Sequence, residues 1–178
     1  MVSNNLPEPI KNARILIIDD EAANLQLFDS IFREEGYGNL LLVEDSREAV
    51  AKFSFHDPDF VLIDWRMPHD DGCEVLKSLR YLIPAEAFTP MVVITADTSH
   101  ETRRQALTAG ANDFLVKPFD VVELTLRVES LLRLRFLYRS LRDEKSSLEQ
   151  KVRDRTRSLQ QVIAELRCSS LPLFNVHV

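Results

Sequence analysis

Acidic, hydroxyl and ammonium side chains stand where apolar runs of this sequence end. Asp19 and Asp20 follow ILII, Asp64 follows FVLI, Thr95 follows MVVI, and Lys117 follows DFLV. If these runs are parallel strands of one sheet, their carboxyl ends share an edge, where ligand crevices lie. That edge would carry three carboxylates, one hydroxyl and one ammonium group.

This set of groups suits metal-assisted phosphoryl chemistry. Three crowded carboxylates repel one another and become stable when a divalent cation lies among them. Oxygen ligands without a nearby His or Cys favour Mg²⁺ over zinc. Asp64 could then attack a phosphoryl group and form an aspartyl phosphate. Lys117 and the Thr95 hydroxyl would stabilise the oxygens of the transferred group.

A purely structural explanation exists for each residue taken alone. A single Asp at the end of a strand is commonplace, and Lys117–Pro118 could be a plain turn. A Lys–Pro peptide that turns sharply, with a cis bond as one option, would also aim the ammonium group back at the edge. The functional interpretation rests on the combination, because four different strands end in these groups in order.

Short apolar runs alternate with segments of helical period along the first 120 residues. The runs are continuous rather than alternating, which indicates strands buried on both faces of a parallel sheet. We therefore predict an α/β fold: a doubly wound, flavodoxin-like, five-stranded parallel sheet of (βα)5 type. The expected strands are Arg14–Asp19, Leu40–Val43, Phe60–Asp64, Met91–Thr95 and Asp113–Lys117. The expected helices are Ala22–Gly36, Ser46–Phe55, Cys73–Leu82, Ser99–Ala111 and a last helix from about Asp120.

Composition argues against several classes of protein. The 178 residues carry a net charge of −6 and are 45% hydrophobic, which suits a folded domain. Residues 1–119 hold 20 acidic and 11 basic residues, so no direct nucleic-acid binding is expected. The two cysteines form no metal or disulfide motif, and no apolar run could span a membrane. A cytoplasmic protein with no membrane contact is expected.

The C-terminal third predicts one long helix. Residues 119–171 contain neither Gly nor Pro, and apolar residues recur there at alternating spacings of three and four. Such spacing is typical of a coiled coil, so we expect a homodimer that pairs through this helix. The alternative is a helix folded back on the first domain. The predicted dimer seam comprises Leu131, Leu134, Tyr138, Leu141, Leu148, Val152, Leu159, Val162 and Leu166, interrupted by Lys145 and Arg155.

Four short segments carry a resemblance to a known family. The segments ILIIDDE, LIDWRMPHDDG, VVITA and LVKPF resemble the signature set of two-component response-regulator receiver domains, over about Ala13 to Leu132. The domain organisation expected is an N-terminal tail (1–12), a receiver (13–132), a coiled-coil helix (133–168) and a C-terminal tail (169–178).

The resemblance assigns roles to single residues. It implies that Asp64 is the phosphoacceptor, that Asp20 binds Mg²⁺ directly, and that Asp19 binds it through water. Arg66 would supply a backbone carbonyl to the metal.

The remaining assigned residues concern phosphate binding and switching. The resemblance makes Lys117 the phosphate-binding lysine, Thr95 the switch hydroxyl and Phe114 the switch aromatic, although simple packing explains Phe114 equally well.

The function implied is a phosphorylation-dependent regulator rather than an enzyme, apart from its own phosphorylation and dephosphorylation. A sensor histidine kinase would donate the phosphoryl group. Two alternatives stay open. The chain could be the regulatory part of a cyclic-di-GMP phosphodiesterase of the HD-GYP type, or of another output enzyme, since RFLYRSLRDEKSSLEQKVRDRT resembles helices that precede HD-GYP domains. It could also be a coiled-coil scaffold with a vestigial acidic site.

Overall fold

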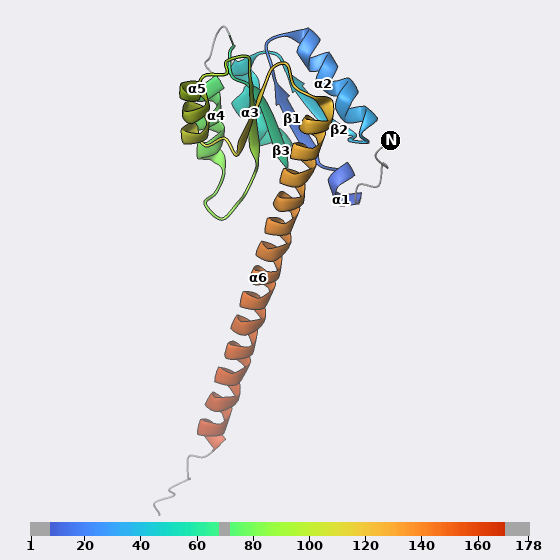
Figure 1. The fold of residues 1–178 in the computed structure, drawn as a ribbon. Helices are drawn as coiled ribbons and strands as arrows, with labels where there is room; N and C mark the ends of the chain where they lie inside the picture. The colour runs from blue at the N-terminus through green and yellow to red at the C-terminus, as the bar shows by residue number, and fades with distance from the viewer. Residues whose placement is uncertain (1–7, 68–71, 170–178) are drawn as a thin grey trace, which may run out of the picture. The chain divides into compact units, whose positions relative to one another are not determined.

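A parallel sheet organises the first part of the chain (Figure 1). The structure, a computed structural model, describes residues 8–67 and 72–169. Within these residues, five strands pair in the order β2-β1-β3-β4-β5, all parallel. The strands are β1 (Arg14–Ile18), β2 (Asn39–Val43), β3 (Phe60–Asp64), β4 (Met91–Thr95) and β5 (Asp113–Val116). The predicted doubly wound fold is confirmed.

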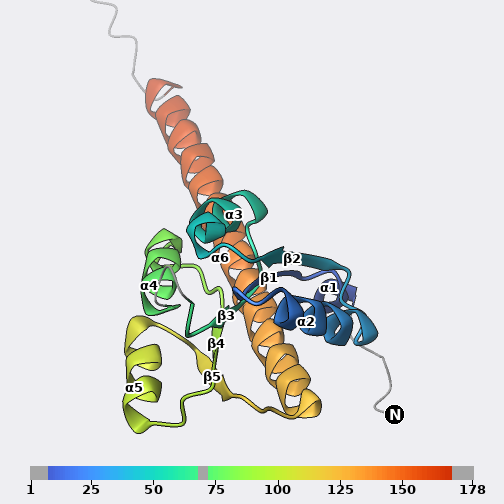
Figure 2. The same cartoon turned by 90° about the horizontal axis from the view of Figure 1, so that it is seen from above.

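Helices cover both faces of this sheet (Figure 2). One face packs against α1, α2 and the start of α6, and the other packs against α3, α4 and α5. The helices are α1 (Glu8–Lys11), α2 (Ala22–Glu34), α3 (Ala49–His56), α4 (Gly72–Leu82), α5 (His100–Ala109) and α6 (Val121–Ser169). A short 3₁₀ helix, η1 (Ser46–Glu48), precedes α3.

The two-sided cover explains the unbroken apolar strands. Successive side chains of a strand point to opposite faces. In β1, Ile15 and Ile17 join the core beneath α2 and α6, whereas Leu16 and Ile18 join the core beneath α3, α4 and α5. All four side chains are fully buried. Each strand can therefore end in a polar residue without disturbing either core.

The segment expected to be an N-terminal tail contains structure. A single helical turn, α1, lies within residues 1–12, and its Ile10 is 4% exposed. Ile10 packs into the core beneath α2. Its burial stabilises the fold, because it removes apolar surface from water. Residues 1–7 of the expected tail lie outside the described range.

The chain divides into two compact units, residues 1–139 and 140–178. Helix α6 begins in the first unit and runs to Ser169 in the second. The described helices include none that is both long and apolar enough to cross a membrane. Residues 170–178 of the expected C-terminal tail are not among those the structure describes.

Candidate functional site

The strand register brings the predicted polar residues to one edge of the sheet. Ile18 of β1 is paired with Ile63 of β3, so Asp19 and Asp64 are the next residues of neighbouring strands. Asp64 in turn is paired with Ile94 of β4. Because all strands are parallel, their carboxyl ends meet where ligands bind in this class of fold.

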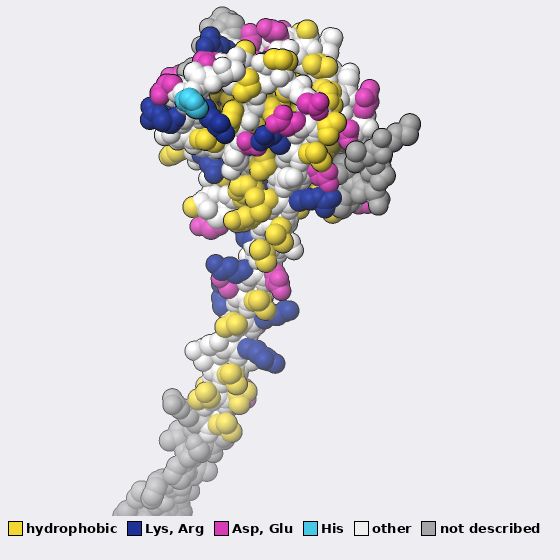
Figure 3. Space-filling view, viewed as in Figure 1, with side chains coloured by type: hydrophobic (Ala, Val, Ile, Leu, Met, Phe, Trp, Pro, Cys, Tyr) yellow, Lys and Arg dark blue, Asp and Glu magenta, His cyan; other side chains and the backbone are white. Residues whose placement is uncertain are grey.

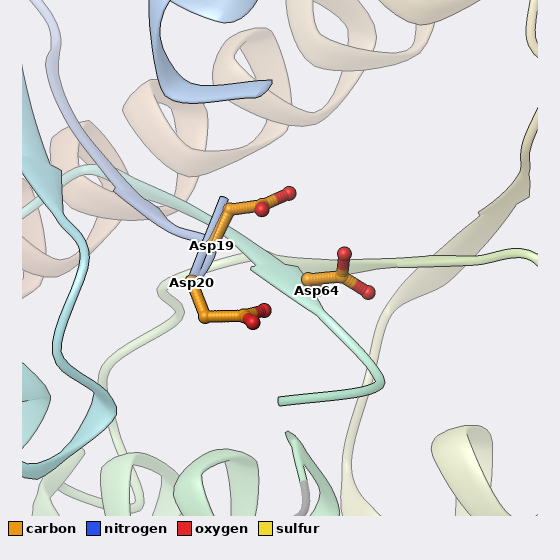
Figure 4. Close-up of side chains that lie close together, drawn as sticks. All are labelled: Asp19, Asp20 and Asp64. Atoms are coloured by element: carbon orange, nitrogen blue, oxygen red, sulfur yellow. The ribbon is translucent and has the colours of Figure 1, made fainter. Parts of the chain in front are cut away.

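Three carboxylates converge at that edge (Figure 4). Asp19, Asp20 and Asp64 each offer one oxygen, and these oxygens lie within 4.8 Å of one another. Asp19 is 1% exposed and Asp64 is 9% exposed, so water screens their mutual repulsion poorly. The donor atoms of this trio are all carboxylate oxygens, which is the ligand chemistry that Mg²⁺ prefers. The residues present therefore fit a magnesium ion.

Lys117 reaches the same place from the end of β5. Its Nζ donates to Asp64 Oδ2 at 2.5 Å and to Asp19 Oδ2 at 3.3 Å. Burial alone would lower the pKa of Lys117, but the two carboxylates outweigh burial and raise it above the ordinary value. Its peptide bond to Pro118 is cis. Lys117 therefore stays cationic and faces the carboxylate that was predicted to accept phosphate.

Asp19 is held in place by donors from the start of α2. Asn24 Nδ2 donates to Asp19 Oδ1 at 2.9 Å and to Oδ2 at 3.1 Å, and the Glu21 backbone N–H donates to Oδ1 at 3.0 Å. Burial raises the pKa of Asp19 above the ordinary value, and these hydrogen bonds offset only part of that effect. A cation beside Asp19 would relieve the cost of its charge.

Thr95 and Arg66 meet in a network around Asp97. The Thr95 hydroxyl accepts from the Asp97 N–H at 3.0 Å, and Arg66 Nη2 donates to Asp97 Oδ2 at 3.1 Å. Donation from the Ser99 N–H, followed by the Thr102 hydroxyl, lowers the pKa of Asp97 to about 2. Asp97 therefore stays ionised in neutral solution and connects the residue two positions after Asp64 with the start of α5.

Phe114 lies in β5. It is partly buried against the core beneath α3, α4 and α5. The guanidinium of Arg103, from α5, lies 4.2 Å from the centre of its ring, a cation–π contact. The switch role of Phe114 stays a prediction.

Gly72, the first residue of α4, lies against the backbone that carries Asp64. Its N–H donates to the Trp65 carbonyl at 3.1 Å. A Cβ added at Gly72 would lie 2.4 Å from the carbonyl oxygen of Asp64 and 2.8 Å from Trp65 Cα. These are backbone atoms, so no side-chain rotation could make room. Gly72 thus allows α4 to pack directly beneath the end of β3.

We expect Gly72→Ala to destabilise the protein by about 2 kcal/mol, the typical cost of overpacking a tight site. Urea denaturation of the substituted and unsubstituted proteins measures this difference. Gly38→Ala is the matched control, because a Cβ at Gly38 meets nothing within 4 Å. Equal losses of unfolding free energy in the two variants would contradict the close approach.

The structure gathers Asp19, Asp20, Asp64 and Lys117 into one cluster, as predicted, whereas metal binding by the Arg66 carbonyl stays a prediction. The Arg66 N–H donates to Asp64 Oδ1 at 3.1 Å.

Sequence reasoning missed three supporting residues. They are Asn24, Gly72 and Asp97. The position of Asn24, early in the helix after the acidic pair, was an available signal.

The predicted seam divides between the two units. Leu131 is partly buried and packs against the core of the first unit. The remaining seam side chains are exposed, and Figure 3 shows hydrophobic side chains at the surface of the helix. The exposed seam residues are Leu134, Tyr138, Leu141, Leu148, Val152, Leu159, Val162 and Leu166. A shallow groove along the helix is lined by Leu141, Lys145, Leu148 and Val152, among others.

Known proteins are similar to this chain in fold and in sequence. The response regulator receiver domain family matches residues 15–129. A Francisella response regulator receiver domain is 33% identical with a TM-score of 0.62, and the match covers 68% of this chain and 98% of that one. The chemotaxis protein CheY4 of Vibrio cholerae is 30% identical with a TM-score of 0.62, covering 67% and 98%.

Curated relatives are longer than this chain. The transcriptional regulatory protein TrcR of Mycobacterium tuberculosis is 37% identical over 120 residues, which cover 67% of this chain and 45% of TrcR. Response regulator PleD of Caulobacter vibrioides is 38% identical over 136 residues, covering 76% and 30%. The chain thus spans less than half the length of these two relatives. The matches over residues 15–129, with the carboxylates and lysine at the sheet edge, establish that the chain belongs to the response regulator receiver domain family.

Proposed function

We propose that this chain is a phosphorylation-dependent response regulator of a two-component system, with Asp64 as the phosphoacceptor. The observation that carries the proposal is the position of Lys117 Nζ, 2.5 Å from Asp64 Oδ2, beside the carboxylates of Asp19 and Asp20. A nucleophilic carboxylate, a cation for the transferred group and a metal-binding pair of acids are the parts that phosphoryl transfer requires. The proposed setting is the cytoplasm.

The proposed donor is a phosphohistidine of a sensor histidine kinase. A carboxylate oxygen of Asp64 attacks phosphorus, the phosphorus–nitrogen bond breaks, and its electron pair returns to the imidazole. Lys117 gives up its ion pair with Asp64 and stabilises the phosphoryl oxygens instead. The Thr95 hydroxyl, now accepting from the Asp97 N–H, is the donor proposed to turn toward the phosphoryl group.

Mg²⁺ is the proposed cofactor. When bound, it would neutralise the acidic cluster and the incoming phosphoryl oxygens. Asp20 would bind it directly, Asp19 through water, and Asp64 and the Arg66 carbonyl would complete the protein ligands. Asp19 supports this assignment, because burial raises its pKa and a cation beside it would favour its charged form.

Phosphorylation can be tested with acetyl phosphate in place of the kinase. We expect the protein to take up a phosphoryl group when Mg²⁺ is present and to lose that ability when EDTA removes the metal. Gels that retard phosphoproteins measure the modified fraction. A protein that stays unmodified at saturating acetyl phosphate and Mg²⁺ would refute the proposed function.

Magnesium is expected to stabilise the fold. At a hundredfold excess over its dissociation constant, a ligand stabilises the native state by about 2.7 kcal/mol, which corresponds to a rise in Tm of roughly 5–10 °C. Asp20→Asn should abolish most of this rise, because it removes the proposed direct ligand. Asp29→Asn, in an exposed ion pair of α2, is the control and should respond as the unsubstituted protein does. Thermal melts across a Mg²⁺ titration give the result, and a full response from Asp20→Asn would contradict the assignment.

The proposed output is pairing of α6 with a second copy of the chain. Every described side chain from residue 140 to 166 is exposed, including six apolar seam residues that are 51–64% exposed. A single helix with such a stripe leaves its apolar surface in water, and pairing buries it.

Charge near the seam is compatible with a second copy as partner. Lys145 occupies a core position of the seam, and its Nζ lies 3.9 Å from Glu149 Oε1 on the same helix. Glu144 is the preceding residue. Two facing copies of Lys145 would thus be flanked by four carboxylates, which offset their repulsion. We propose a homodimer of moderate stability.

The known relatives do not favour the alternatives of a phosphodiesterase fragment or an inert scaffold. The assembled acids and lysine support a working phosphoacceptor. Uptake from acetyl phosphate separates the proposal from the scaffold, because an inert scaffold would take up no phosphoryl group.

A further inference from the structure

A buried carboxylate lies at the opposite edge of the sheet from Asp64. Asp59 directly precedes β3 and is 3% exposed. Its Oδ2 accepts from the backbone N–H of Arg14 at 3.2 Å and from Arg14 Nε at 3.4 Å. Its own N–H donates to the Arg14 carbonyl at 2.8 Å. One side of this carboxylate is therefore bound to the start of β1.

The other carboxylate oxygen faces α6. Arg135 Nε lies 3.5 Å from Asp59 Oδ1, and Arg139 Nη1 lies 3.8 Å from the same atom. Among the described residues, Asp59 Oδ1 has no hydrogen-bond partner, so its ion pairs with Arg135 and Arg139 add to the compensation that Arg14 gives at Oδ2. A buried carboxylate without a counter-charge is strongly unfavourable. If this part of α6 left the sheet, Asp59 would keep Arg14 but lose two of its three cations, so Asp59 favours the state in which α6 lies on the sheet.

Two further contacts lie on the same face of the helix. Arg135, itself 9% exposed, donates from Nη1 to the Phe88 carbonyl at 2.8 Å. The ring of Phe88 packs against Tyr138, with centroids 5.1 Å apart. Positions 135, 138 and 139 are three and four apart and so share one face of a helix. Together with Asp59 they form what we call the latch: Asp59, Phe88, Arg135, Tyr138 and Arg139.

The latch uses residues that the seam would also use. Tyr138 is a seam residue whose ring packs against Phe88. Leu131, another seam residue, packs against the core of the first unit. Leu134 lies between them. A second helix cannot pack fully against these layers while the receiver already contacts two of them. Pairing is then confined to the layers from Leu141 onward.

We propose that Asp59 is a positioning residue that holds α6 on the receiver through the latch and thereby limits how far two helices pair. Opening the latch releases Leu131 and Tyr138, which can then join the seam together with the exposed Leu134 between them, so the receiver competes with the partner helix for the same surface. This inference rests on the proposed pairing of α6. If the inference holds, Asp59, a buried charge at the opposite edge of the sheet from Asp64, affects the strength of the dimer.

Amide hydrogen exchange tests the latch itself. We expect faster exchange across residues 133–139 in Asp59→Asn and in Arg139→Gln than in the unsubstituted protein. Arg139 is half exposed and its ion pair is with Asp59, so its variant should fold even if Asp59→Asn does not. Asp57→Asn is the matched control: Asp57 pairs with Arg14 and lies at a left-handed position that Asn tolerates. Exchange in Arg139→Gln equal to that of the control would overturn the latch.

The dimer dissociation constant tests the limit on pairing. Sedimentation equilibrium should give a constant about tenfold lower for Arg139→Gln than for the Asp57→Asn control, the effect of about 1.4 kcal/mol of added pairing. Faster exchange without tighter pairing would overturn the proposed limit. A chain that stays monomeric in every variant would contradict the proposed pairing, and the limit with it. The exchange result would still decide whether Asp59 holds the helix.

Discussion

Replacing Asp64 with Asn is expected to reduce phosphoryl uptake from acetyl phosphate to background. The amide cannot supply the anionic oxygen that attacks phosphorus, and it removes the charge that Lys117 Nζ now faces at 2.5 Å. The side chains are nearly the same size, so the fold should persist. Retarding gels measure uptake, and circular dichroism verifies folding.

A matched control is available one strand away. Asp97→Asn alters a carboxylate that contacts Arg66 and Thr102 but lies outside the trio of converging oxygens. We expect this variant to accept a phosphoryl group. Uptake that persists at the unsubstituted level in Asp64→Asn would assign the chemistry to another residue and contradict the account.

Placing charge in the seam is expected to dissociate the proposed dimer. The double variant Leu148→Glu/Val152→Glu puts four carboxylates into adjacent layers of a pair, where the present side chains are apolar and more than half exposed in the single chain. Loss of apolar burial together with like-charge repulsion should raise the dissociation constant by more than about 100-fold, or roughly 2.7 kcal/mol. Sedimentation equilibrium over a concentration series measures this change.

The control adds the same charge to the opposite face of the helix. Ser147→Glu/Gln161→Glu changes two exposed positions outside the seam and should leave the dissociation constant almost unchanged. If both double variants weaken association equally, net charge rather than the seam determines pairing. If neither does, α6 is not the dimer surface.

The sheet and its acidic edge could be predicted because the relevant signals are local. Unbroken apolar runs indicate strands covered on both faces, and β1 and β3 have that cover. In a parallel sheet the residue that ends each run goes to a common edge, so Asp64 and Lys117 needed only their positions in the sequence to be placed together. The structure adds the side-chain distance, which shows that Lys117 and Asp64 form an ion pair.

The supporting residues could not be predicted because their roles depend on tertiary contacts. Asp97 accepts a hydrogen bond from Arg66, which lies 31 positions earlier in the sequence. Gly72 lies against the backbone of Asp64. Heptad spacing has a related limit. It cannot distinguish a residue that packs against a second helix from one that packs against its own domain. Leu131 and Tyr138 fit the seam pattern and yet contact the first unit.

The same limit hid the latch. A buried Asp59 that depends on Arg135 and Arg139 joins residues about 80 positions apart, and no short motif marks such a pairing. Charged residues on a long helix usually form a solvated face. In the structure, Arg135 is instead buried, and its guanidinium contacts Asp59 and the Phe88 carbonyl.

The most direct measurement is identification of the residue that carries the phosphoryl group. Protein treated with acetyl phosphate and Mg²⁺ would be reduced with borohydride, which converts an aspartyl phosphate to homoserine, and then digested and sequenced by mass spectrometry. The account predicts homoserine at position 64 and unmodified aspartate at positions 19 and 20. Homoserine at another position, or at none in a protein that is folded and bound to Mg²⁺, would contradict it.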